Sequence, residues 1–140
     1  MIKPKVLFIC SGNSCRTQMA EGFLRQLGGE RFQPFSAGAD VTAELDPDAV
    51  SAMQEIGIDI SHQQPKKLDP FMRERMSYVV TLCEREIERT CPIFPGAIWR
   101  LKWPIEDPAL AKDPETHWRK VCQARDELQQ RITEFIQANS

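Results

Sequence analysis

The feature that most constrains the fold is a short, uninterrupted apolar run at 6–10, Val-Leu-Phe-Ile-Cys. A run of this length, without alternating polar residues, is typical of a strand buried on both faces of a parallel sheet. A second run at 78–83, Tyr-Val-Val-Thr-Leu-Cys, has the same character, and 35–37 and 97–101 are weaker strand candidates. Parallel strands need long crossover connections, and these are usually helices.

Helix signals lie between and after these strands. Apolar residues at helical spacing fill 17–27, and Gly28-Gly29 ends that segment. Asp-Pro pairs, which combine a helix N-cap with a first-turn proline, occur at 46–47, 69–70 and 113–114. The alternation of strand and helix predicts an α/β fold with a single domain over 1–140. In this fold, helices flank both faces of a four-stranded parallel sheet.

Composition limits the classes of function. With 18 basic and 20 acidic residues the net charge is −2, which argues against binding of nucleic acid or acidic membranes through bulk charge. The apolar runs are far shorter than the roughly 18 residues of a membrane span. We expect a cytoplasmic monomer, in which the five cysteines do not form a disulfide framework. Inert buried thiols, a metal site, and redox or nucleophilic chemistry remain as interpretations.

Residues 10–17, Cys-Ser-Gly-Asn-Ser-Cys-Arg-Thr, connect the first strand to the first helix. A cysteine followed after five residues by an arginine is the spacing of a thiol-based oxyanion loop. Gly12 and Asn13 tolerate positive φ, so backbone N–H groups can turn inward at a helix start that favours an anion. These donors and Arg16 should stabilise a thiolate at Cys10. The predicted oxyanion-binding residues are Ser11, Gly12, Asn13, Ser14, Cys15, Arg16 and Thr17.

The same spacing recurs at Cys83 and Arg89, so the spacing alone is weak evidence. The five residues between this second pair are Glu-Arg-Glu-Ile-Glu, whose acidic side chains would repel an anion. The sequence therefore predicts an oxyanion site only at the first pair.

The stretch VLFICSGNSCRTQMAEGF resembles the active-site opening of the low-molecular-weight tyrosine phosphatase superfamily, and within it the chain is most similar to the thioredoxin-coupled arsenate reductases. Further similar segments follow in order: SAG at 36–38, IGIDIS at 56–61, VVTLC at 79–83, CPIFPG at 91–96 and WPIEDP at 103–108. The resemblance implies a phosphatase-like sheet and reduction of arsenate to arsenite in arsenic detoxification, with phosphate and sulfate as competing oxyanions. It also implies a general acid on an Asp-Pro loop, at Asp107, with Glu106 as the competing carboxylate.

The resemblance further implies a disulfide relay. In it, the Cys10 thiolate attacks arsenate, Cys83 attacks the Cys10 sulfur, and Cys91 attacks Cys83. The final Cys83–Cys91 disulfide is reduced by thioredoxin, with glutaredoxin as the alternative donor, and no bound cofactor is required. A helix over 83–91 would separate these two Cα atoms by about 12 Å. A disulfide needs roughly 4.4–6.8 Å, so this segment must unwind or loop out.

The other candidate ligands are expected to be structural. Cys15 and Cys122 are interpreted as a loop residue and a packed thiol, and His62 and His117 as surface residues without ligand spacing. A zinc site built from Cys10, Cys15, Cys83 and Cys91 lacks a Cys-x-x-Cys pair.

Some relatives hold a potassium ion beneath the loop, and three of its ligand positions match Asn13, Glu21 and Ser36. The fourth ligand position falls near Pro65-Lys66, where no carboxylate is present. Either the Lys66 ammonium occupies the place of the cation, or the site is absent.

Two other functions remain open. A low-molecular-weight tyrosine phosphatase would need Cys10, Arg16 and Asp107 but neither Cys83 nor Cys91. Such phosphatases typically pack phosphotyrosine against aromatic residues, whereas this chain has a single Tyr, Tyr78, inside a predicted strand. A non-catalytic oxyanion-binding or metalloid-binding module would bind stoichiometrically without consuming reductant.

Overall fold

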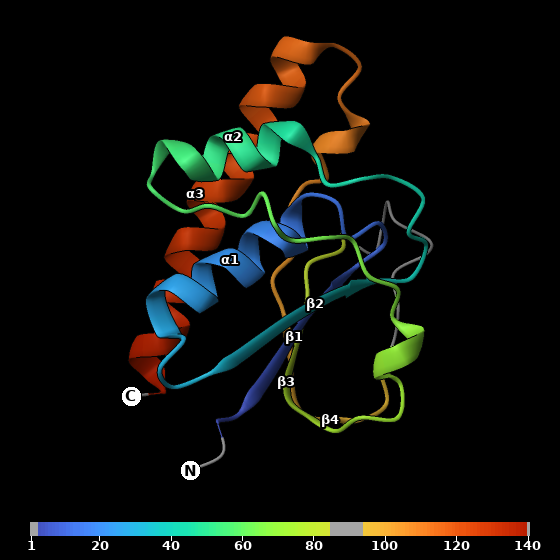
Figure 1. Cartoon of the computed structure of the whole chain (residues 1–140), viewed down its shortest axis with the longest axis vertical. Coiled ribbons are helices and arrows are strands. Elements are labelled where there is room, and N and C mark those ends of the chain that lie inside the picture. Colours follow the sequence, from blue (N-terminus) through green and yellow to red (C-terminus); the bar gives the residue numbers. More distant parts are fainter. Residues whose placement is uncertain (1–2, 85–93, 140) are drawn as a thin grey trace.

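The computed structural model describes residues 3–84 and 94–139 (Figure 1). Its strands are β1 (Lys5–Cys10), β2 (Gln33–Gly38), β3 (Met76–Thr81) and β4 (Ala97–Lys102). Its α-helices are α1 (Arg16–Gly28), α2 (Pro47–Glu55) and α3 (Pro114–Ala138), and two 3₁₀ turns are η1 (Asp69–Phe71) and η2 (Pro108–Leu110). The four predicted strands and the predicted helix starts at 47 and 114 are thereby confirmed.

All four strands are parallel and lie in the order β2-β1-β3-β4. The first strand is central because its residues are apolar on both faces, and 6–10 are all buried. It pairs with β2 as far as Cys10 opposite Gly38, and with β3 as far as Ile9 opposite Thr81. The carboxyl ends of the strands therefore meet at one edge, where ligands bind in open parallel sheets.

The three α-helices pack on one face of the sheet (Figure 1). Val6 and Phe8 face these helices, and the alternate residues Leu7 and Ile9 form a second, smaller core. The expectation of helices on both faces was wrong for the described residues. There the second face is covered by η1 and by loop residues, among them Leu68, Phe71 and Phe94. The segment 61–75 contains two prolines and few apolar residues, so it forms a single 3₁₀ turn instead of a helix.

Aspartate caps set the starts of two helices. Asp46 accepts a hydrogen bond from the N–H of Asp48, and Asp113 accepts one from the N–H of Thr116. Gly57 follows α2 with a φ of 82°, a conformation that terminates helices at low cost only for glycine. Among the helices in the described ranges, none combines the length and the apolar character that a bilayer crossing requires.

Candidate active site

The anion loop, residues 10–17, lies between the end of β1 and the start of α1. Cys10 is 2% exposed, and its sulfur accepts a hydrogen bond from the N–H of Asn13 at 3.2 Å. It also lies 3.4 Å from the hydroxyl of Thr17. Two donors at this distance stabilise a thiolate, because negative charge on sulfur strengthens both hydrogen bonds.

Asn13 holds the loop in shape. Its φ is 54°, in the left-handed region, whereas Gly12 does not use its tolerance for positive φ. The Asn13 side chain is fully buried, and it donates to the Thr17 hydroxyl at 2.7 Å. Its carbonyl oxygen accepts from Gln18 at 3.0 Å and from the N–H of Lys66 at 2.7 Å. These contacts fix a conformation that asparagine adopts more readily than most residues.

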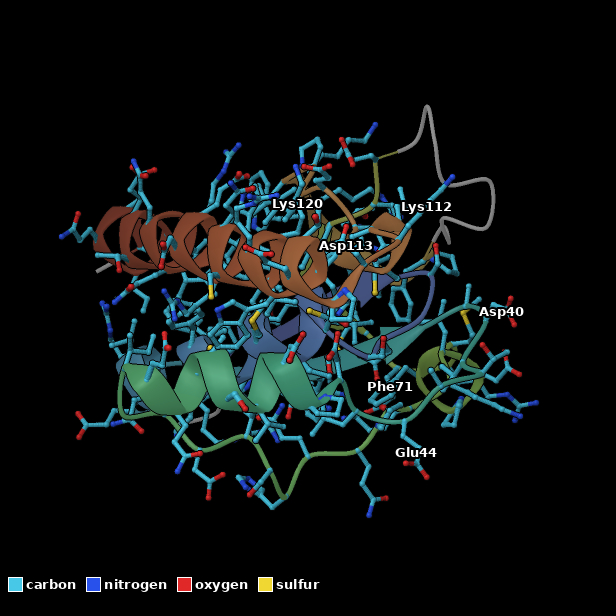
Figure 2. The ribbon with its side chains drawn as sticks, turned by 90° about the horizontal axis from the view of Figure 1, so that it is seen from above. Asp40, Glu44, Phe71, Lys112, Asp113 and Lys120 are labelled. Atoms are coloured by element: carbon cyan, nitrogen blue, oxygen red, sulfur yellow. The ribbon has the colours of Figure 1, made fainter. Side chains whose placement is uncertain are left out.

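Neighbouring segments hold the outside of the loop. The carbonyl of Ser11 accepts from the N–H of Asp40 at 2.8 Å, and the carbonyl of Ser14 accepts from the N–H of Asp46 at 2.9 Å. These bonds occupy carbonyl oxygens that would otherwise repel an anion. Figure 2 shows Asp40 in the loop after β2, toward the same end of the molecule as Lys112 before α3.

Arg16 is the first residue of α1 and is 3% exposed. Its Nη1 donates to the carbonyl of Leu82 at 3.2 Å and to that of Ile105 at 3.0 Å, just beyond β3 and β4. Its Nη2 lies 3.5 Å from Oδ2 of Asp107. The guanidinium is therefore pre-oriented between the strand ends and the Asp107 carboxylate, so little side-chain entropy remains to be lost on binding an oxyanion.

The side chains of the two candidate general acids, Glu106 and Asp107, point to different partners. Asp107 caps η2 by accepting from the N–H of Ala109 at 3.0 Å, and its second oxygen faces Arg16. The side chain of Glu106 is 55% exposed and forms an ion pair of 3.0 Å with Lys120 on α3, a residue labelled in Figure 2. Only Asp107 of this pair reaches the anion loop.

Cys83 is buried at the same sheet edge as Cys10. It lies two residues beyond Thr81, where β3 ends. The N–H of Leu82 donates to the carbonyl of Ile9 at 3.0 Å, so Cys10 and Cys83 directly follow two hydrogen-bonded residues of adjacent strands. Cys91 lies outside the described residues. So do residues 85–90 of the segment 84–90 that is predicted to unwind.

The two remaining thiols are placed for packing. Burial, together with the charge of Asp46, raises the pKa of Cys15 well above its ordinary value. Burial also raises the pKa of Cys122, which packs against the helix side of the core. Both thiols therefore stay protonated at neutral pH and are poor nucleophiles.

Glu21 is a buried carboxylate beneath the loop, 4% exposed. It accepts a hydrogen bond from the Ser36 hydroxyl at 2.6 Å and forms ion pairs with Lys66 at 3.3 Å and with Arg25 at 2.5 Å. Two side-chain cations thus already compensate this buried charge.

Sequence reasoning missed one residue near the site. His62 is exposed, as expected, but His117 is three-quarters buried, with Nε2 2.7 Å from Oδ2 of Asp46. One ligand atom each of Asp46, Asp48 and His117 lies within 4.8 Å of the other two, but the hydrogen bond already satisfies the ring nitrogen, so we assign no metal site to them. The sequence signal for the His117–Asp46 contact is that both residues lie at Asp-Pro helix starts. This signal indicates a contact only when α2 is known to pack on α3.

Comparisons with known proteins agree with this geometry. The chain matches the low molecular weight phosphotyrosine protein phosphatase family over residues 5–139. It is 40% identical over 133 residues to an arsenate reductase of Bacillus subtilis, a match that covers 94% of each chain.

Among solved structures, it is similar to an arsenate reductase in the phosphate binding state, with a TM-score of 0.81, 30% identity, and coverage of 98% of this chain and 99% of the other. A thioredoxin-dependent arsenate reductase of Corynebacterium glutamicum gives a TM-score of 0.73 at 30% identity, covering 99% of this chain and 64% of that one. With the Cys-x5-Arg loop and the four-stranded parallel sheet, these matches establish that the chain belongs to the low-molecular-weight phosphotyrosine protein phosphatase family.

Proposed function

We propose that the protein reduces arsenate to arsenite by a thiol relay through Cys10, Cys83 and Cys91. The observation that carries this proposal is the pair of buried thiols, Cys10 and Cys83, at the ends of adjacent strands beside one oxyanion loop. A phosphatase needs the first thiol and water but has no use for the second. The near full-length similarity to arsenate reductases supports the same reaction.

The first step uses the loop and two charged side chains. Arg16 and the loop N–H groups bind the arsenate oxygens, and the Cys10 thiolate attacks arsenic to form a sulfur–arsenic bond. Asp107 donates a proton to the departing oxygen, which leaves as water. The phosphate-bound structure of a relative supports an oxyanion at this loop, and phosphate and sulfate are expected to compete with arsenate.

The second step transfers two electrons. The Cys83 thiolate attacks the Cys10 sulfur, so a sulfur–sulfur bond forms and the sulfur–arsenic bond breaks. The electron pair of the broken bond stays on arsenic, which is released as arsenite. Cys91 then attacks Cys83 and releases the Cys10 thiolate, leaving a Cys83–Cys91 disulfide.

An external dithiol must supply the two electrons for the next turnover. Thioredoxin is the proposed donor, supported by the thioredoxin-dependent relative, and glutaredoxin is the alternative. The protein itself needs no bound cofactor, since cysteines carry the electrons. A reducing thiol pool is a property of the cytoplasm, where we place the reaction, with a monomeric single domain over 1–140 as the working unit.

A potassium ion beneath the loop does not fit the residues present. The site would use Asn13, Glu21 and Ser36, but the Glu21 carboxylate already receives Lys66, Arg25 and the Ser36 hydroxyl. We propose that the Lys66 ammonium takes the place of the cation, and no step of the reaction depends on a bound metal.

The test is arsenate-dependent oxidation of NADPH in the presence of thioredoxin and thioredoxin reductase. Cys83→Ser should abolish turnover, while the packed-thiol control Cys122→Ser should retain it. Steady turnover by Cys83→Ser would contradict the relay, and stoichiometric arsenate binding without NADPH oxidation by the wild type would indicate a binding module.

Thiol titration tests the third cysteine. Cys91→Ser should stop after one turnover with two thiols lost, because the Cys10–Cys83 disulfide cannot be transferred. Unchanged steady-state activity of this variant would remove Cys91 from the relay.

The phosphatase alternative is supported by Cys10, Arg16 and Asp107 alone. It predicts hydrolysis of p-nitrophenyl phosphate that is fast relative to arsenate reduction and unaffected by Cys83→Ser.

A further inference from the structure

The His117 ring, in the first turn of α3, bridges two segments that border the anion loop. Its Nδ1 lies 2.8 Å from the carbonyl of Pro108 in η2, and its Nε2 lies 2.7 Å from Oδ2 of Asp46, the N-cap of α2. The ring is 23% exposed and is held from both sides.

The identity of the two partners determines the protonation of the ring. A backbone carbonyl can only accept a hydrogen bond, and so can an ionised carboxylate. Both ring nitrogens must therefore donate, which requires the doubly protonated imidazolium. A neutral ring has one N–H and would lose one of the two contacts.

The surroundings favour this charged form. Burial lowers the pKa of His117, but the hydrogen bonds to Pro108 and Asp46 and the charges of Asp46 and Asp48 outweigh it, so the pKa lies above its ordinary value. Within residues 3–84 and 94–139, the charged groups that form ion pairs with the ring are these two aspartates at the start of α2, while η2 presents a carbonyl. The positive end of the α3 dipole opposes protonation, and Asp113 caps that end.

Both ends of the bridge continue into the catalytic machinery. The N–H of Asp46 donates to the carbonyl of Ser14 in the anion loop at 2.9 Å. Pro108 directly follows Asp107, whose carboxylate caps η2 and lies 3.5 Å from Arg16. A continuous line of hydrogen bonds thus joins the loop that binds the oxyanion to the turn that presents the acid.

We propose that His117 is a positioning residue: its imidazolium clamps the Asp107 turn to the start of α2 and thereby holds the general acid over the anion loop. This proposal rests on the proposed function and adds a residue that contacts neither substrate nor sulfur. It predicts that catalysis weakens when the ring loses its proton, because one of the two clamp contacts is then lost.

Kinetics of three variants test the clamp. His117→Gln keeps one donor and no charge, so kcat should fall about tenfold or more, within the range that a general acid contributes, while KM changes little. His117→Arg restores two N–H donors and a permanent charge, so it should recover most of kcat. The exposed control His62→Gln should match the wild type.

The pH profile separates positioning from bulk stabilisation. Wild-type kcat should decline as pH rises through the pKa of His117, and that limb should be missing in His117→Arg. A His117→Gln enzyme with the kcat and pH profile of the wild type would overturn the proposal, as would an equal loss in His62→Gln.

A readout independent of arsenate chemistry distinguishes failure of the clamp from failure of the proposed function. In ¹⁵N NMR of the wild type, both His117 ring nitrogens should be protonated below a midpoint that lies above about 6.5 and that falls in Asp46→Asn. A midpoint at or below that value, or one unmoved by the substitution, would overturn the clamp even in an active enzyme. If the wild type lacks arsenate-dependent NADPH oxidation, the proposed function fails while this measurement still decides on His117. Because it uses the wild type, the NMR titration still tests the proposal when His117→Gln fails to fold.

Discussion

At the scale of single residues, Gly38 shows how tightly β2 approaches the anion loop. A Cβ at this position would lie 2.8 Å from the carbonyl oxygen of Ser11 and 2.9 Å from the Cβ of Asn13. Neither atom is the end of a flexible side chain, so any side chain here must displace the loop. The requirement is one of space, because Gly38 has no positive φ.

Gly38→Ala should therefore weaken oxyanion binding more than it weakens folding. We expect the Kd for phosphate, measured by calorimetry, to rise at least several-fold, because the loop N–H groups move off their positions. Gly38→Val should be worse. An unchanged Kd in the alanine variant would mean that the loop accommodates the extra carbon without losing its shape.

The proposed oxyanion binding by Arg16 depends on the shape of the guanidinium group as well as on its charge. Its planar fork reaches two carbonyls and the Asp107 carboxylate at once, whereas lysine offers a single ammonium group. Arg16→Lys should lower kcat/KM for arsenate about 100-fold, the scale of losing one preorganised donor to a developing charge. A decrease of less than about threefold would show that a point charge is sufficient.

At the scale of elements, α1 is linked to the segment 61–66 through Glu21. The carboxylate on α1 receives Ser36 from β2 and Lys66 from that segment, so three parts of the chain meet at one buried charge. Buried charges are stable only when they are compensated, and Lys66 provides part of this compensation from within the chain.

Turnover should accordingly be the same in potassium and in sodium chloride at equal ionic strength. Lys66→Ala should create a sensitivity to cations, because Glu21 then loses one of its two compensating charges. Clear activation of the wild type by potassium over sodium would contradict the assignment of Lys66 to the cation's place.

The long helix α3 contributes to the core through one stripe of side chains. Val121, Leu128 and Ile132 are fully buried at helical spacing, while Gln129 is exposed. The stripe packs against α1 and α2, so it also sets the position of His117 at the start of the helix.

Leu128→Ala should lower the free energy of unfolding by about 2–5 kcal/mol, since it leaves a cavity in a close-packed region. Urea denaturation monitored by circular dichroism measures this change. Gln129→Ala, one residue away on the solvent side, should change stability by less than about 0.5 kcal/mol. Equal effects of the two substitutions would mean that α3 does not pack as described.

At the scale of the whole molecule, the proposed oxyanion binding by an acidic chain must rely on local structure. The net charge of −2 provides no general attraction, so backbone N–H groups, a helix start and Arg16 must supply all of it. At His117 the charges are reversed: acidic neighbours stabilise a protonated, positively charged ring.

The stability that His117 contributes should therefore depend on pH. Because its folded pKa is raised, this contribution is fully present below the unfolded value of about 6.5 and is lost as pH rises through the folded pKa. The difference in unfolding free energy between wild type and His117→Gln, measured in urea at several pH values, should shrink over that window. A difference that grows with pH would contradict the sign of the shift.

Acid should destabilise the protein through other groups. The hydrogen bonds from Ser61 lower the pKa of Asp59, and those from Thr116 lower the pKa of Asp113. Their contributions are present above the ordinary carboxyl pKa and are lost as pH falls through the lowered values.

Much of the fold was predictable because its signals are local. Apolar runs located the strands, and Asp-Pro pairs located helix starts at 47 and 114, since capping and burial act within a few residues. The same locality made the anion loop readable, because strand end, turn and helix start follow one another over residues 10–17. The choice between Glu106 and Asp107 was not local, since it depends on Lys120 and Arg16 reaching these carboxylates from two different helices.

By itself, the sequence determined the α/β class and the position of the Cys-x5-Arg loop between the first strand and the first helix, and it predicted the thiols of the proposed relay. Only the tertiary structure decided that the three α-helices share one face of the sheet, that Lys66 compensates Glu21, and that His117 bridges Asp46 and Pro108. The physical reason is the range of the interactions. Caps, turns and strand burial are set by neighbouring residues. The His117 contact, by contrast, joins residues 71 positions apart and exists only because α2 packs against α3.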